Sequence, residues 1–145
     1  MMNRPKAIGT HAESLATIWL REHGFPDAVR IAQAGAADTG DIRLMPGLHA
    51  EVKGGRAAEH ASVGQVEQWL YECDAEAMHS GAKVFLIMKR RGHGAAGVGN
   101  WTTAARMGEF GSLSDPKGTM YLMLPLFRFV ELPVMRAFAL QAGVQ

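Results

Sequence analysis

The apolar residues nearest the amino terminus recur at the spacing of one helix face, which predicts an amphipathic helix over residues 10–23. They fall at i, i+3, i+4 and i+7, and they are Ala12, Leu15, Ala16 and Trp19. Glu13 borders this stripe, and Gly24 follows the helix, where a glycine commonly ends one. The predicted helix therefore packs one face against a core and carries a carboxylate beside that face.

Short runs of strand length follow this helix. Residues 28–33 predict a first strand, and the glycine- and alanine-rich residues 34–40 predict a loop. Residues 41–45 and 48–53 are two further apolar runs, and the Pro46-Gly47 turn between them predicts a hairpin. We expect the three strands to form one small sheet beside the first helix.

A second helix is predicted between two clear end signals. Ser62 and Gln65 have the spacing of a capping box, and Gly81 stops the helical pattern. The apolar stripe consists of Val66, Trp69, Leu70, Cys73 and Ala77. The polar residues assigned to the other faces are Gln65, Gln68, Glu72 and Glu76. Residues 54–61 predict a loop before this helix, and the continuous apolar run at 84–88 predicts a central strand buried on both sides.

The rest of the chain is less regular in its pattern. Its predicted elements are a flexible loop at 92–99, a strand at 101–107, a short helix around Glu109, a strand at 120–129 that Pro125 interrupts, and a closing helix at 134–142 that Pro133 begins. The predicted order is that of an α/β protein: a helix, a three-stranded hairpin sheet, a helix and a strand, followed by a C-terminal strand and helix.

Composition narrows the class of protein. A length of 145 residues, with 48% hydrophobic and 20% charged residues, suits a single globular domain. The single cysteine, Cys73, excludes an internal disulfide and a cysteine-based zinc site, and it fits a cytoplasmic location. The amino terminus lacks the layout of a secretory signal, and charges and prolines interrupt the apolar residues 120–140, so we expect no membrane span.

The formal net charge of +1 does not by itself indicate a nucleic-acid-binding protein, so a binding surface must come from local clusters. One stretch holds four basic residues and a histidine with no acidic residue among them: Lys83, Lys89, Arg90, Arg91 and His93. Within this stretch, Lys89 to Arg91 lie at the end of the predicted central strand, beside a glycine-rich loop. This position favours contacts with a DNA backbone over a plain solvated surface. Arg56, in the predicted loop after Lys53, is a weaker candidate of the same kind.

Three charged residues of the predicted hairpin have the chemistry of a metal-dependent nuclease. Residues two apart in a strand share a face, so Glu51 and Lys53 point the same way while Val52 turns into the core, and the hairpin returns Asp41 beside them. Phosphodiester hydrolysis needs an activated water and a counter-charge, which a divalent cation supplies. The two carboxylates and the Val52 carbonyl suit Mg²⁺ or Mn²⁺. Lys53 is then placed to orient or deprotonate the water, or to hold the phosphate.

Together these residues resemble the PD-(D/E)xK nuclease superfamily and, more narrowly, the archaeal-type Holliday junction resolvases and their relatives encoded by actinobacterial phages. The motifs that carry the resemblance are Gly9-Thr10-His11-Ala12-Glu13, Arg30, Gly40-Asp41-Ile42, Pro46-Gly47, Glu51-Val52-Lys53, Gln68-Trp69-Leu70-Tyr71-Glu72 and Lys89-Arg90-Arg91-Gly92. One departure is Gly40, which stands where the family usually has a proline that shapes the turn. Since that proline coordinates nothing, the departure leaves the expected ligands in place.

The resemblance implies a magnesium-dependent DNA endonuclease with a restriction-endonuclease-like core over residues 1–113 and an extension over residues 114–145, packed on the same domain or at a dimer interface. It also implies a homodimer that acts on DNA in the cytoplasm, that of a bacterial host if the gene belongs to a phage. The site residues that it implies are Asp41 and Glu51 as metal ligands, Lys53 as the catalytic residue, Glu13 near the metal directly or through water, and Gln65 in support, for which Gln68 competes.

Some alternatives stay open. Arg30 is either a phosphate contact or a plain charge on an edge strand. For the metal ligand, Asp41 is favoured over Asp38, because Asp38 lies within the loop. Branched DNA, above all the four-way junction, is the substrate that the resemblance favours. A duplex-cutting, nicking or restriction-type endonuclease is one alternative, and a DNA-binding module with a degenerate nuclease site is another.

Overall fold

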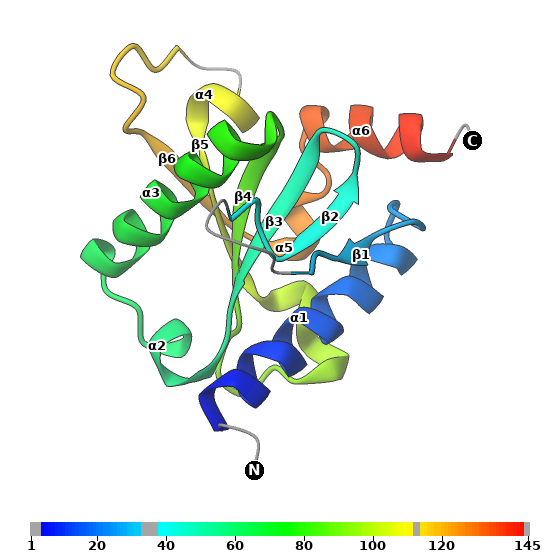
Figure 1. The fold of residues 1–145 in the computed structure, drawn as a ribbon, viewed down its shortest axis with the longest axis vertical. Coiled ribbons are helices and arrows are strands. Elements are labelled where there is room, and N and C mark those ends of the chain that lie inside the picture. Colours follow the sequence, from blue (N-terminus) through cyan, green and yellow to red (C-terminus); the bar gives the residue numbers. More distant parts are fainter. Residues whose placement is uncertain (1–3, 33–37, 112–113, 144–145) are drawn as a thin grey trace.

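Six strands form one mixed sheet in the computed structural model, which describes residues 4–32, 38–111 and 114–143 (Figure 1). The strands follow one another in sequence order, and they are β1 (Val29–Arg30), β2 (Ile42–Met45), β3 (Leu48–Lys53), β4 (Lys83–Met88), β5 (Thr102–Arg106) and β6 (Tyr121–Pro125). Neighbouring strands are antiparallel except β3 and β4, which are parallel. The protein is therefore α/β, with the parallel pair at the centre of the sheet.

Helices cover both faces of this sheet (Figure 1). Their bounds are α1 (Arg4–Glu22), α2 (Gly55–Glu59), α3 (Val63–Ser80), the 3₁₀ helix η1 (Ala95–Asn100), α4 (Met107–Phe110), α5 (Leu126–Phe129) and α6 (Pro133–Gly143). Helices α1, α5 and α6 share one apolar core with one face of the sheet, and α3 packs on the other face. A parallel pair needs a long crossover, and α2 and α3 supply it between β3 and β4.

Strand β4 lies at the centre because both of its faces are apolar. Phe85 and Ile87 belong to the core under α1, whereas Leu86 and Met88 belong to the core under α3. Each fully buried side chain of this size stabilises the fold by about 1.5–3 kcal/mol. The predicted central strand is therefore confirmed.

Helix α3 begins and ends where its signals predicted. The hydroxyl of Ser62 accepts a hydrogen bond from the Gln65 backbone N–H at 3.1 Å. Gly81 adopts a left-handed conformation with φ of 73°, and its N–H donates to the Ala77 carbonyl at 2.8 Å. Capping of this kind stabilises a helix by about 1 kcal/mol at the N-terminus.

In the part of the chain before β2 and between β3 and α3, three elements differ from their prediction. Helix α1 begins at Arg4 rather than at residue 10, because a proline in the first turn is tolerated and Gly9 costs only about 1 kcal/mol inside a helix. Residues 55–59 form α2 where a loop was predicted, because alanine and glutamate favour helix and Ala58 packs against the core under α3. Strand β1 has two residues, while the end of its predicted range, residue 33, and the predicted loop residues 34–37 lie outside the described residues.

The C-terminal segment adds a strand and two helices to the same sheet and core. Strand β6 pairs with β5 along its length and ends at Pro125, so the predicted strand over 120–129 is wrong beyond that residue. Leu126 and Phe129 lie one helical turn apart and are both fully buried, which favours α5 over a continued strand. The predicted division after residue 113 falls at residues 112–113, outside the described part of the chain. No helix among the described residues is long and apolar enough to cross a bilayer.

Candidate metal centre

Strand β3 directs two charged side chains toward helix α3. Val52 belongs to the core under α1, so the alternation of a strand turns Glu51 and Lys53 to the other face. The ammonium of Lys53 lies 5.6 Å from the ring centre of Trp69 and 3.1 Å from Glu72 Oε2, both on α3. The prediction that Glu51 and Lys53 share a face while Val52 turns into the core is confirmed.

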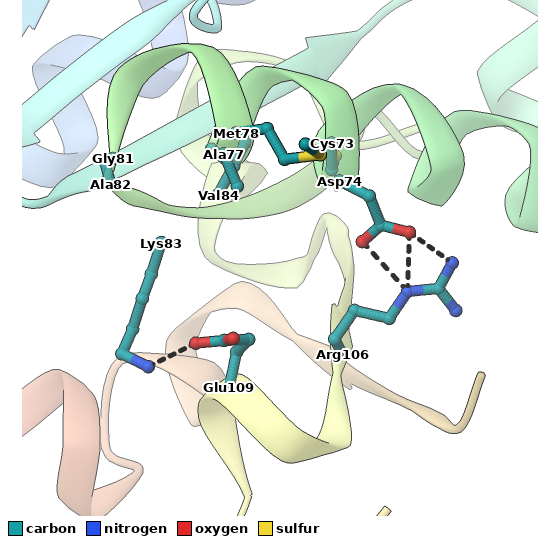
Figure 2. A pocket seen from close by; sticks show the side chains of 10 residues that line it. All are labelled: Cys73, Asp74, Ala77, Met78, Gly81, Ala82, Lys83, Val84, Arg106 and Glu109. Atoms are coloured by element: carbon teal, nitrogen blue, oxygen red, sulfur yellow. Dashed lines mark hydrogen bonds and ion pairs between the residues drawn. The ribbon is translucent and has the colours of Figure 1, made fainter. Parts of the chain in front are cut away.

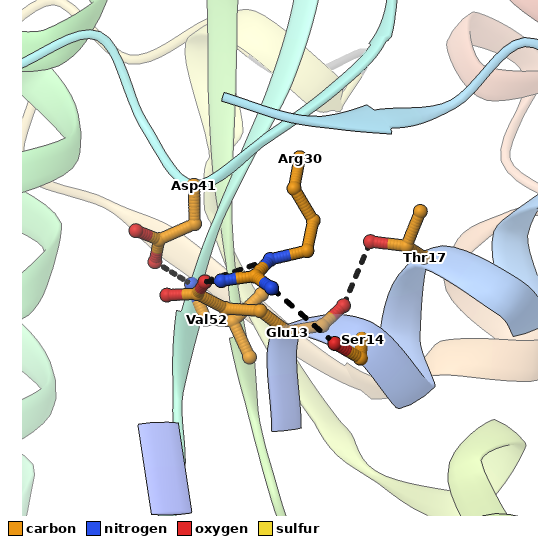
Figure 3. Close-up of polar contacts among 6 residues, drawn as sticks. All are labelled: Glu13, Ser14, Thr17, Arg30, Asp41 and Val52. Carbon is orange, nitrogen blue, oxygen red and sulfur yellow. Dashed lines mark hydrogen bonds and ion pairs between the residues drawn. The ribbon is translucent and has the colours of Figure 1, made fainter. Parts of the chain in front are cut away.

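The hairpin brings Asp41 beside this pair, as predicted. Its carboxylate accepts a hydrogen bond from the Val52 backbone N–H at 2.7 Å (Figure 3). The Asp41 N–H donates to the Ala50 carbonyl at 2.9 Å. The preceding Gly40 is buried with φ of 114°, and a Cβ there would lie 3.3 Å from the Ala50 oxygen. Because the proline ring fixes φ near −65°, a proline cannot replace Gly40 in this turn.

Glu13 approaches Asp41 from helix α1. Its carboxylate forms an ion pair with Arg30 of β1, with Nη2 and Oε2 2.7 Å apart, and Arg30 also reaches the Ser14 hydroxyl at 3.4 Å (Figure 3). Burial, together with the negative charge of Asp41, raises the pKa of Glu13 despite this ion pair. Arg30 therefore holds Glu13 in place on the side of Asp41 that faces α1.

The central carboxylates of the site repel one another. Burial, together with the neighbouring Glu51, raises the pKa of Asp41 to about 8. Burial, together with Glu76 of α3, likewise raises the pKa of Glu51 to about 8. Near neutral pH these groups hold protons unless a cation compensates their charge.

Glu76 is a member of the site that the sequence pattern missed. It was assigned to the polar faces of α3, but its side chain is only 2% exposed and lies against the site. Oxygen atoms of Asp38, Glu51 and Glu76 lie within 4.8 Å of one another. Burial raises the pKa of Glu76 to about 7. Asp38, set aside in favour of Asp41, thus joins the same cluster.

A spacing in α3 could have revealed this face. Residues three and four apart share one side of a helix, and such a polar stripe runs through Gln65, Gln68, Glu72 and Glu76. Its C-terminal half lines a cavity of about 220 Å³ together with Asp38, Glu51 and Lys53. Gln65 is half-buried in the first turn of α3 and does not line this cavity, so the predicted support role for Gln65 stays a prediction.

Lys53 carries its positive charge in the metal-free protein. Burial lowers its pKa, but the charges of Glu51 and Glu72 outweigh that effect, so the pKa of Lys53 is raised overall. Its ammonium lies 4.0 Å from Glu51 Oε2. In this state Lys53 donates hydrogen bonds and cannot accept a proton, which favours holding a phosphate or a water over deprotonating one.

The predicted basic cluster divides between the two ends of β4. Lys83 begins the strand and pairs with Glu109 beside a separate cavity of about 530 Å³, where Arg106 binds Asp74 (Figure 2). Lys89 follows the other end, where its N–H donates to the Lys53 carbonyl at 2.9 Å. Lys83 therefore does not belong to the candidate site, and its grouping with Lys89 was wrong.

Arg90 and Arg91 follow Lys89 and are exposed, and Arg56 is exposed three residues after Lys53. These four basic residues thus follow the C-terminal ends of the parallel strands β3 and β4, the end of the sheet at which Lys53 lies. Arg30 is also exposed, but its guanidinium is engaged with Glu13.

The donor set fits a hard divalent cation. The side chains that converge here are carboxylates, and the Val52 carbonyl belongs to the residue whose N–H already faces Asp41. Oxygen ligands of this kind suit Mg²⁺ and Mn²⁺. Cys73 lies on the buried face of α3, and burial, followed by the charge of Glu76, raises the pKa of its thiol. A thiol that keeps its proton is a poor metal ligand and a poor nucleophile.

Neither protein-family models nor curated proteins nor solved structures yield a match to this chain.

Proposed function

We propose that the protein is a metal-dependent endodeoxyribonuclease that hydrolyses phosphodiester bonds in branched DNA, as do the Holliday junction resolvases that its motifs resemble. In this proposal α1, β1 to β3, α3 and β4 are the restriction-endonuclease-like core. The observation that carries the proposal is the convergence of Asp41, Glu51 and Lys53, with Glu13 beside them, at one end of a mixed sheet.

Asp41, Glu51 and the Val52 carbonyl would hold Mg²⁺, which Mn²⁺ replaces, and Glu13 would reach it directly or through water. The ion supplies a more acidic water and a counter-charge for the phosphorane oxygens. In the reaction a water oxygen forms a bond to phosphorus and that water gives up a proton to solvent, while an ester P–O bond breaks and the leaving oxygen takes up a proton from solvent. Lys53, as an ammonium, binds a non-bridging phosphate oxygen and steadies the charge that develops there.

The basic residues at the same end of the sheet suit the DNA backbone. In this proposal the DNA phosphates are contacted by Arg56, Lys89, Arg90 and Arg91, of which the three arginines are exposed. Each such contact makes binding more sensitive to salt and adds no sequence preference. Arg30 is assigned a supporting contact at the edge of this surface through its exposed side chain.

A second copy of the chain suits this function, because two sites related by a two-fold axis match the equivalent strands of a junction. Strand β6 is an edge strand, and Met123 within it and Met120 before it are about half exposed. Edge strands present backbone N–H and C=O groups to a partner strand. We therefore assign the dimer contact to β6.

The test is cleavage of a synthetic four-way junction and of a linear duplex of the same sequence, with Mg²⁺ at fixed salt. Paired symmetric nicks in the junction alone are expected, and Asp41→Asn, Glu51→Gln and Lys53→Ala should abolish them. Glu67→Gln, on the exposed side of α3, is the matched control and should cut normally. Equal cutting of the duplex would favour the duplex or nicking alternative. Junction binding without any cutting would favour the degenerate DNA-binding module.

A further inference from the structure

We propose that Asp38, Glu51 and Glu76 bind a divalent cation of their own, separate from the ion assigned to Asp41, so that Glu51 bridges two cations. The inference rests on the proposed function for the first ion and adds a second site built by helix α3. The three ligands come from three parts of the fold: the segment before β2, strand β3 and helix α3.

The distances between the carboxylates fit a cation. The candidate ligand oxygens of the three residues all lie within 4.8 Å of one another. Oxygens that face each other across an ion, each about 2.1–2.4 Å from it, lie about 4–5 Å apart.

Glu76 provides an independent indication of a ligand. Its side chain is 2% exposed, and among the described residues its carboxylate oxygens have no hydrogen-bond partner apart from a proton that Glu51 can share with them. A buried carboxylate without a partner costs several kcal/mol if it is ionised. The nearest ammonium, that of Lys53, is already bonded to Glu72 at 3.1 Å and lies 4.0 Å from Glu51. When Glu51 and Glu76 are both ionised, a cation between them supplies the partner that Glu76 then lacks.

The charge and size of the cavity agree with this assignment. It is lined by the carboxylates of Asp38, Glu51, Glu72 and Glu76 and by the ammonium of Lys53, a formal excess of three negative charges. Its volume of about 220 Å³ leaves room for waters, each of which occupies about 30 Å³ and several of which Mg²⁺ retains.

His79 holds Asp38, the most exposed of the three ligands, in place. Its Nδ1 lies 3.0 Å from the Asp38 carbonyl oxygen, which can only accept, so Nδ1 carries the proton. The Asp38 carboxylate in turn accepts from the Gly40 N–H at 3.0 Å through Oδ1.

The test is a count of bound Mn²⁺ by electron paramagnetic resonance of the free ion, on the full chain at pH 7.5 and without DNA. Wild type should bind two ions per chain. Glu76→Gln and Asp38→Asn should each bind one ion, because each lowers the affinity of the second site for Mn²⁺ at least tenfold. Glu51→Gln should lose both ions, because it removes the shared ligand. The control Glu67→Gln should bind two.

Asp38→Asn keeps the acceptor for the Gly40 N–H, so it decides the question if Glu76→Gln does not fold. A count of one in wild type, or an unchanged count of two in both Glu76→Gln and Asp38→Asn, would overturn the second site. Cleavage is measured separately. If wild type binds two ions and loses one in these variants but cuts no DNA, the second site stands and the proposed nuclease function fails. If wild type binds one ion and cuts DNA, the proposed nuclease function stands and the second site fails.

Discussion

Replacing Glu76 by glutamine should stabilise the metal-free protein at alkaline pH and leave its stability unchanged at acidic pH. Folding raises the pKa of this carboxyl from its ordinary value of 4.5 to about 7. A raised folded pKa means that the full stability is present below pH 4.5 and is lost as the pH rises through about 7. Glutamine has no proton to lose, so the variant escapes that loss.

The pKa shift of Glu76 sets the ceiling of the effect. A change from 4.5 to about 7, at about 1.36 kcal/mol per pH unit, corresponds to about 3 kcal/mol. Part of this is already relieved when Glu51 keeps a proton, so we expect a gain of about 1–3 kcal/mol at pH 8. For a domain of this size the gain corresponds to a melting temperature raised by roughly 3–10 °C.

The assay is urea unfolding and thermal melting in EDTA at pH 4.5, 6 and 8, with Glu67→Gln as the control on the exposed face of the same helix. The gain of Glu76→Gln should be near zero at pH 4.5 and reach its full size above pH 7, while the control should stay within 0.5 kcal/mol of wild type. An equal gain at all three pH values, or a loss at pH 8, would refute the placement of a buried, unpaired carboxylate at residue 76.

Other changes test other parts of the molecule. Lys53→Ala should bind a four-way junction near the wild-type affinity in a gel-shift assay yet cut it at least 100-fold more slowly, since the ammonium acts on the reacting phosphate; normal cutting would remove its catalytic role. Gly40→Ala should lower the free energy of unfolding by roughly 1–3 kcal/mol in urea, because side chains rarely adopt φ of 114° and a Cβ there would lie 3.3 Å from the Ala50 oxygen. Arg90→Ala with Arg91→Ala should weaken junction binding and reduce the slope of log affinity against log salt by about 1 for each phosphate contact removed, and an unchanged slope would place these residues off the DNA. Met123→Lys should shift the protein from dimer to monomer in light scattering if β6 is the dimer contact, and a variant that stays dimeric would exclude that surface.

The parts of the site that local rules govern could be predicted from the sequence. Strand alternation placed Glu51 and Lys53 on one face, and the Pro46-Gly47 hairpin returned Asp41 to them. The start of α3 followed from the Ser62 cap. These features depend on residues that lie close together in the chain, so periodicity and turn chemistry suffice.

The parts that depend on packing between distant segments could not be predicted in this way. Glu76 is polar and lies on a polar stripe, so its sequence position alone indicates solvent; only the docking of α3 against β3 buries it. Lys83 and Lys89 belong to one basic run, but an extended strand of this length separates their Cα atoms by about 20 Å. The end of β6 at Pro125 is a similar case, because the buried spacing of Leu126 and Phe129 is visible only once the core is known.

The crowded carboxylates make the metal-free fold less stable, which bears on what the site is for. A leucine in place of Glu76 would fill the same buried position without any charge, so packing alone does not require an acid there. A bound ion reverses the balance: at a free concentration 100 times the dissociation constant it stabilises the folded state by about 2.7 kcal/mol. That is comparable to the roughly 3 kcal/mol lost at Glu76. Mg²⁺ should therefore raise the melting temperature more at pH 8, where the carboxylates are ionised, than at pH 5, where protons compete for them. A larger stabilisation at pH 5 would contradict a metal-binding role for these acids.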